Sequence, residues 1–98
     1  MRPIHTAELD EVRPVLILTR ELVRPHLSRV TVAPITSTVR GLSTEIQVGR
    51  DNGLAQDSVN CDNIVTIPTA ALRRQIGYFL PSQESALSLA IRAALDLD

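Results

Sequence analysis

With 98 residues the chain has room for one hydrophobic core, so we expect a single domain over residues 1–98. Ten arginines, with no lysine, stand against eleven acidic residues for a formal net charge of −1, and 44% hydrophobic residues exclude a disordered charged tail. No apolar run reaches the ~18 residues of a membrane span, and no apolar stretch near the N-terminus is typical of a secretory signal, so we expect a cytoplasmic protein without membrane contact.

The first part of the chain is predicted to form strands. Residues 4–9 predict a short first strand. The unbroken aliphatic run 14–19 is too short for a helix and predicts a strand buried on both faces. Residues 21–28 predict a loop, and residues 30–36 a third strand whose Pro34 indicates a sheet edge or a bulge.

Shorter elements are predicted next. Residues 38–43 form a connection to residues 44–48, which alternate polar and apolar as a half-solvated strand does. Residues 49–53 are a turn cluster whose Asn-Gly pair tolerates a positive φ. The remaining elements before the last helix are a strand, one helical turn and a final strand, over residues 59–67, 69–74 and 75–80.

The end of the chain predicts a helix that opens at residues 81–84. Ser82 is the expected N-cap, and Glu84 lies in the first turn, where the helix dipole favours a carboxylate. The apolar arc covers more than half the circumference, so either the helix is wedged deeply or part of it faces another subunit; we favour the second. Several short strands followed by one helix predict an α+β domain built on a small, strongly bent antiparallel β-barrel.

Common catalytic motifs are missing from this sequence. The four glycines do not form a phosphate loop, and no serine lies in a G-x-S-x-G turn. His5, His26 and Cys61 share no metal-ligand spacing, so neither a metal nor a cofactor is expected. Polar groups do remain at three predicted strand ends, namely Arg13, Thr36 with Ser37, and the trio Asn60, Asp62 and Asn63.

Each of these groups alone has an ordinary structural explanation. Arg13 fits a surface cation that pairs with Asp10 or Glu11. Thr36 fits a strand-end hydroxyl, and Asp62 a turn or capping carboxylate. Their order along the chain is more informative than any one of them.

Three segments taken in order resemble the MazF/PemK toxin family: RPVLIL at 13–18, VAPITS at 32–37 and SVNCDNIVTI at 58–67. With the C-terminal helix, the resemblance covers about residues 4–97. It implies an SH3-like barrel that forms a homodimer and cuts single-stranded RNA at short sequences, without a metal, leaving a 2′,3′-cyclic phosphate and a 5′-hydroxyl. It also implies a cognate MazE-like antitoxin that blocks the site, and no DNA contact for the toxin alone.

Carried onto this chain, the resemblance implies a set of site residues. Arg13 would stabilise the charge that develops on the phosphate oxygens, and Thr36 would hold a non-bridging oxygen. Asp62 falls on the acidic residue that is the general base in some members. Contacts with RNA are expected from Ser37, Arg40, Asn60, Asn63 and Arg24.

The chain departs from the family pattern in two places. Only residues 10–12 separate the first predicted strand from Arg13, where relatives carry a long loop, and Asn60 stands where some relatives have arginine or histidine. Two alternative functions follow from the same fold. One is a non-enzymatic gyrase-poisoning toxin of the CcdB type, against which the lack of tryptophan counts; the other is an inactive barrel that binds an antitoxin.

Overall fold

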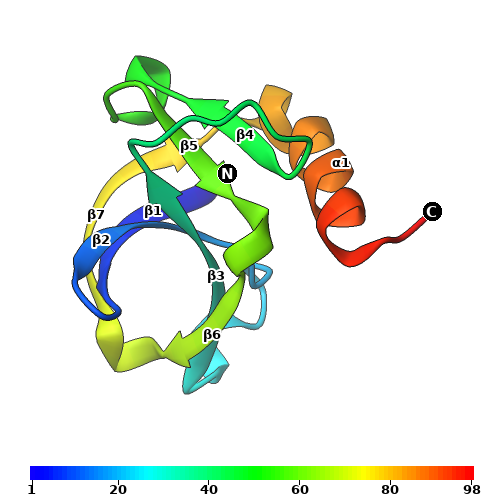
Figure 1. Ribbon diagram of the computed structural model, residues 1–98. Coiled ribbons are helices and arrows are strands. Elements are labelled where there is room, and N and C mark those ends of the chain that lie inside the picture. Colours follow the sequence, from blue (N-terminus) through cyan, green and yellow to red (C-terminus); the bar gives the residue numbers. More distant parts are fainter.

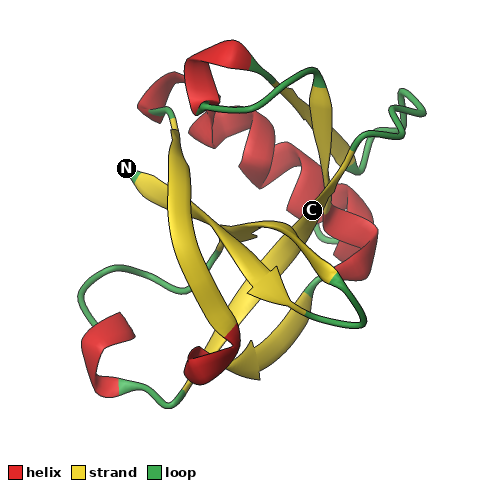
Figure 2. Cartoon of the chain, turned by 90° about the vertical axis from the view of Figure 1, so that its left-hand side faces the viewer, coloured by secondary structure: helices red, strands yellow, loops and turns green.

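The computed structural model describes residues 1–98 and contains seven antiparallel strands and one α helix. The strands follow the order β4-β5-β3-β2-β1-β7, with β6 also paired to β3. The sheet curls into a half-barrel, and the helix lies outside the curl beside β4 (Figures 1 and 2). This arrangement confirms the predicted bent antiparallel barrel with a C-terminal helix.

The element bounds are β1 Arg2–Glu8, β2 Val12–Ile17, β3 Arg29–Thr36, β4 Glu45–Val48, β5 Asp57–Asn60, β6 Val65–Pro68, β7 Leu72–Phe79 and α1 Glu84–Leu95. The structure contains no helix with the length and apolarity of a membrane span.

Strand β2 confirms the prediction of a strand buried on both faces. It lies between β1 and β3, and Val15, Leu16 and Ile17 are all buried. Leu16 packs into one core cluster, whereas Val15 and Ile17 pack into a second cluster on the opposite face. An aliphatic run without polar interruptions is what a strand with two buried faces requires.

Pro34 predicts either a sheet edge or a bulge; the edge position is wrong, because β3 lies inside the sheet, and the register of β3 on β2 shows no shift up to Pro34. On one side β3 pairs with β2. On the other side it pairs with β6 over residues 29–32 and with β5 over residues 35–36. Pro34 falls between these two partners, where its missing N–H removes no bond to either strand.

The single strand predicted over residues 59–67 is also wrong, because a 3-10 turn at Cys61–Asn63 divides it into β5 and β6. The side chain of Asn60 caps this turn, since its Oδ1 accepts a 2.9 Å hydrogen bond from the Asp62 amide. Short polar side chains compete in this way with the strand ladder. A further 3-10 turn at Thr69–Ala71 confirms the predicted helical turn in part, and β7 begins earlier than predicted.

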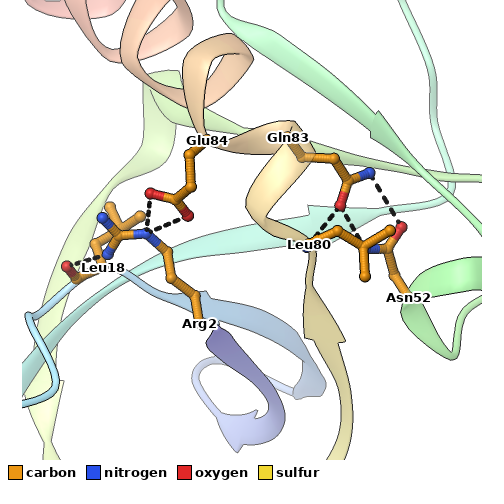
Figure 3. A network of polar contacts seen from close by, with 6 residues as sticks. All are labelled: Arg2, Leu18, Asn52, Leu80, Gln83 and Glu84. Atoms are coloured by element: carbon orange, nitrogen blue, oxygen red, sulfur yellow. Dashed lines mark hydrogen bonds and ion pairs between the residues drawn. The ribbon is translucent and has the colours of Figure 1, made fainter.

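The start of α1 differs from the prediction, because Ser82 is not its N-cap. Residues Pro81–Gln83 form a 3-10 turn, and the α helix begins at Glu84. Oε1 of Gln83 accepts hydrogen bonds from the Leu80 amide at 2.9 Å and from Nδ2 of buried Asn52 at 2.7 Å (Figure 3). Gln83 therefore ties the 3-10 turn to Leu80 and Asn52, and no side chain caps the first amides of α1.

Arg2 joins the first strand to the helix. Its Nε donates to both carboxylate oxygens of Glu84, at 3.1 and 2.9 Å, and its Nη1 donates to the Leu18 carbonyl at 2.7 Å (Figure 3). Glu84 lies in the first helical turn, as predicted. The contact fixes where α1 leaves the sheet.

The helix is not wedged deeply into the fold. Only Leu87 and Ala90 are buried in α1, whereas Leu89 and Leu95 remain 66% and 58% exposed. Leu97 beyond the helix is also 58% exposed. The outer side of the helix therefore presents an apolar surface.

Candidate functional site

Arg13 and Thr36 lie across from each other on neighbouring strands. The register of β2 on β3 pairs Val15 with Pro34, and its continuation places Arg13 opposite Thr36. Because side chains alternate along a strand, both point to the face that carries Val15 and Val32 in the core. Arg13 and Thr36 therefore continue, near the ends of their strands, the face that buries Val15 and Val32 in the core.

Two adjoining pockets share these residues, and we call them together the Arg13 cleft. The first has a volume of about 260 Å³ and the second about 210 Å³. The first is lined by Glu11, Arg13, Pro14, Ile35, Thr36, Ser37 and Asp57. The second is lined by Arg13, Pro34, Thr36, Thr38, Arg40, Glu45, Asn60 and Asn63. The structure thus brings together six predicted site residues, namely Arg13, Thr36, Ser37, Arg40, Asn60 and Asn63.

The guanidinium of Arg13 is paired with acidic side chains of the turn between β1 and β2. Its Nη2 donates to Oε1 of Glu11 at 2.7 Å and lies 3.6 Å from Oδ1 of Asp10. The pairing expected of a surface arginine is therefore present. The Nε atom is buried and has no hydrogen-bond partner. Glu11 therefore holds one end of the Arg13 guanidinium, and the buried Nε stays unpaired.

The hydroxyl of Thr36 is oriented by the chain that follows it. Its Oγ1 accepts a 3.2 Å hydrogen bond from the Thr38 amide. The oxygen is thereby fixed in the lining of both pockets, and its proton is left to donate. A donor at a set position beside a guanidinium is suited to holding an anionic oxygen.

Asp62 does not line either pocket of the cleft. Its Oδ2 accepts a 2.7 Å hydrogen bond from the Thr44 hydroxyl, and its amide is held by Asn60. Asp62 follows Asn60 and precedes Asn63, which both line the second pocket. The carboxylates in the lining belong to Glu11, Asp57 and Glu45, none of which the sequence marked as site residues.

Arg24 lies away from the Arg13 cleft. It lines a separate pocket of about 280 Å³ together with Arg2, Arg20 and Glu84 near the start of α1. The 3-10 turn Arg24–His26 comes after the end of β2, whereas Arg13 stands at its beginning. The sequence prediction that Arg24 acts with Arg13 is therefore not supported by their placement.

Cys61 is the first residue of the 3-10 turn Cys61–Asn63, and its thiol is free but buried. The thiol is 2% exposed. Burial, with a smaller contribution from the neighbouring Asp62 carboxylate, raises the pKa of Cys61 from 9.0 to about 11. A thiol with this pKa stays protonated near neutral pH. No three side chains of histidine, cysteine, aspartate or glutamate come together to hold a metal ion.

Known proteins resemble this chain over its full length. The sequence model of the PemK-like, MazF-like toxin of type II toxin-antitoxin systems matches residues 2–95. Endoribonuclease MazF3 of Mycobacterium tuberculosis is 68% identical over 99 residues, covering 100% of this chain and 96% of the relative. Probable endoribonuclease MazF5 of the same species is 34% identical, covering 91% and 85%.

Solved structures agree with the sequence comparison. The Mycobacterium tuberculosis toxin MazF-mt6 superposes with a TM-score of 0.97 at 65% identity, covering 99% of both chains. An endoribonuclease in complex with its cognate antitoxin, from a mycobacterial species, superposes with a TM-score of 0.89 at 26% identity, covering 98% and 93%.

Proposed function

The chain belongs to the PemK-like, MazF-like toxins of type II toxin–antitoxin systems, and from this premise we propose that it cuts single-stranded RNA in the Arg13 cleft. Because its relatives are endoribonucleases, the chain is an endoribonuclease toxin. In the proposed reaction the ribose 2′-hydroxyl attacks the adjacent phosphorus and the bond to the 5′-oxygen breaks. The products are a 2′,3′-cyclic phosphate and a 5′-hydroxyl, and no metal or cofactor takes part.

Arg13 carries the main electrostatic role in this proposal. Attack by the 2′-oxygen increases the negative charge on the phosphate oxygens, and a guanidinium held in place stabilises that charge. The two terminal nitrogens of Arg13 are the donors for this purpose, of which Nη2 is shared with Glu11, whereas Nε is buried away from a ligand. Arg13 cannot take the proton, because arginine keeps its charge at every relevant pH.

Thr36 holds a second oxygen of the phosphate. Its hydroxyl stands opposite Arg13 in both pockets, so the phosphate would be gripped from two strands. Such a grip sets the line of attack between the 2′-oxygen and the leaving 5′-oxygen. Ser37, Arg40 and Asn63 would contact the neighbouring nucleotides from the same lining.

Asp62 is the proposed acceptor of the 2′-hydroxyl proton. The carboxylate stands between Asn60 and Asn63 in the chain and is oriented by Thr44. Glu11 and Asp57 are the competing carboxylates, because they line the pocket beside Arg13. Asp62→Asn should therefore lower the turnover number without weakening RNA binding; if turnover is unchanged, the proton goes to Glu11 or Asp57.

The proposed partners are a cognate MazE-like antitoxin and a second copy of this chain, in the cytoplasm. A related endoribonuclease with its cognate antitoxin supports the first, and the exposed apolar side of α1 supports the second. An acidic antitoxin segment would compete with RNA for Arg13 and Arg40. The gyrase-poisoning alternative has no support, since the relatives are named endoribonucleases.

The single observation that carries this proposal is the shared placement of Arg13 and Thr36 in one cleft. The test incubates the purified protein with a long single-stranded RNA in the presence of a chelator. Discrete fragments that a polynucleotide kinase can label directly at their 5′-hydroxyl ends are expected. Uncut RNA, fragments with 5′-phosphates, or equal cutting by Arg13→Ala would contradict the proposed reaction.

A further inference from the structure

Glu45 is a carboxylate in the wall of a cleft that would bind an anion. It lines the pocket of about 210 Å³ together with Arg13 and Arg40. A negative charge at this place repels the phosphate groups of RNA, so by its charge alone Glu45 lowers the affinity of the cleft for RNA. The hydrogen bonds of the side chain indicate what offsets this repulsion.

The carboxylate of Glu45 holds the loop of residues 37–44, which joins β3 to β4. Its Oε1 accepts hydrogen bonds from the amides of Arg40 at 3.1 Å and Leu42 at 3.0 Å. The amide of Glu45 in turn donates to the Leu42 carbonyl at 3.1 Å. Gly41 between the two amides has φ +72°, and a left-handed residue lets the amides on either side of it converge on one acceptor. Three hydrogen bonds to one residue therefore close this part of the loop.

The two ends of the same loop are tied to predicted site residues. At its start the Thr38 amide donates to Oγ1 of Thr36 at 3.2 Å, and at its end the Thr44 hydroxyl donates to Oδ2 of Asp62 at 2.7 Å. Residues 39–43, which lie between these ties, form hydrogen bonds only with Glu45. The segment that carries Arg40 is therefore anchored by this one residue.

Arg40 is the part of the loop that would meet RNA. Arg13 and Arg40 are the only cations in the cleft lining. Nη2 of Arg13 is paired with Glu11, whereas the Arg40 guanidinium forms no ion pair. It is free to bind a phosphate group, and the affinity that it adds depends on how firmly its backbone is held, because ordering a loop upon binding costs free energy.

We propose that Glu45 is a positioning residue, which raises the affinity of the cleft for RNA by fixing the backbone that carries Arg40. The inference rests on the proposed function, since it needs RNA in the cleft. The affinity gained from a preorganised Arg40 is larger than the affinity lost to the charge of Glu45. The cleft therefore needs an acceptor at position 45 and does not need its negative charge.

The test compares two substitutions that remove the same charge. Glu45→Gln keeps an oxygen that can accept from both amides, whereas Glu45→Ala removes it. With one RNA that the wild type cuts, the KM of Glu45→Gln should fall by about 2- to 5-fold, the range of an exposed charge pair. The KM of Glu45→Ala should rise by about 3- to 10-fold, because part of a charge-assisted hydrogen bond from Arg40 is lost. The turnover number should be unchanged in both variants.

Arg40→Ala separates positioning from a general effect on the fold. By itself it should raise the KM by about 10-fold, the loss of one charge-assisted hydrogen bond. In the Arg40→Ala background, Glu45→Ala should no longer raise the KM and should lower it instead, because only the removal of a repulsive charge is left.

Two further variants control for folding. Glu45→Met retains the length of the side chain without the carboxylate acceptor and should raise the KM as Glu45→Ala does. Gln47→Ala changes an exposed residue of β4 outside the cleft and should keep the wild-type KM. Unfolding temperatures of all variants show that the comparison is between folded proteins.

Three results would overturn the inference. The first is a KM of Glu45→Ala that is equal to or lower than that of Glu45→Gln. The second is a rise in KM on Glu45→Ala that is the same with and without the Arg40 side chain. The third is a wild-type protein that cuts no RNA, which contradicts the proposed function as well, whereas the first two leave that function intact.

Discussion

Nη2 of Arg13 lies 2.7 Å from Oε1 of Glu11, so the guanidinium that faces the cleft is paired with a carboxylate from the turn just before it. The turn has only three residues, Leu9 to Glu11, between β1 and β2. In a chain with a longer loop these acidic groups need not reach Arg13. Here the Glu11 carboxylate binds Nη2 of the Arg13 guanidinium, a nitrogen that the phosphate of RNA would otherwise use.

Removing that carboxylate should therefore improve RNA binding. Glu11→Gln leaves Arg13 without its competing anion, and the KM for RNA should fall by up to ~5-fold, because exposed ion pairs contribute at most about 1 kcal/mol. Initial rates across a range of RNA concentrations measure this. Glu8→Gln is the matched control, since Glu8 pairs with Arg73 outside the cleft. An unchanged or higher KM would show that Glu11 does not compete with the phosphate.

Arg13 should not be replaceable by lysine. Arg13→Lys keeps the charge but loses the two parallel donors of the fork, so the turnover number should fall by about 10²–10³. Single-turnover cleavage of one short RNA measures the chemical step directly. Arg73→Lys, which changes an exposed arginine away from the cleft, should retain wild-type turnover. Equal turnover of the two variants would remove Arg13 from the chemistry.

Gly77 should be essential for folding. A Cβ at this position would lie 1.8 Å from the carbonyl oxygen of Asn52, and backbone cannot move aside cheaply. Gly77→Ala should destabilise the protein by more than ~3 kcal/mol, above the range of most single substitutions. Gly41→Ala is the control, because Gly41 has φ +72° but nothing within 4 Å, and should lose only about 1 kcal/mol. Urea unfolding that ranks the two variants in the opposite order would contradict this packing.

The buried thiol of Cys61 should make stability fall at alkaline pH. Folding raises the pKa of Cys61 from 9.0 to about 11, so its contribution is complete below pH 9 and is lost as pH rises toward 11. The unfolded chain releases this proton first, which favours unfolding by up to ~3 kcal/mol.

The measurement is the free energy of unfolding of wild type and Cys61→Ala between pH 8 and 11. The wild type should lose its advantage over Cys61→Ala across this interval, because alanine carries no proton. A constant difference between the two proteins at all pH values would mean that the thiol does not titrate as described.

The outer side of α1 should hold two copies of the chain together. Leu89 is 66% exposed, and Leu95 and Leu97 are each 58% exposed. Leu89→Arg should convert a dimer to a monomer in analytical ultracentrifugation, because a buried unpaired charge is unfavourable at an interface. Arg92→Ala is a control on the same helix that retains the apolar residues. A dimer that persists in Leu89→Arg would place the interface elsewhere.

Local features of the sequence were sufficient for several conclusions. The aliphatic run that became β2 predicts its own burial, since no polar residue interrupts it. The order of Arg13, Thr36 and the Asn60–Asn63 segment indicated the family and most of the cleft. These features are patterns of residue types along the chain, so they can be recognised without knowing which strands pair.

Other features depended on which strands pair. From the sequence, Pro34 predicts an edge or a bulge, whereas in the structure the partner of β3 changes from β6 to β5 beside it. Glu45 is expected on the solvated side of a strand, whereas β5 places Asn60 directly opposite it. Arg24 belongs to the other end of β2 from Arg13. The pairing and register of distant segments decide which side chains share a face, and no local pattern of residues encodes that register.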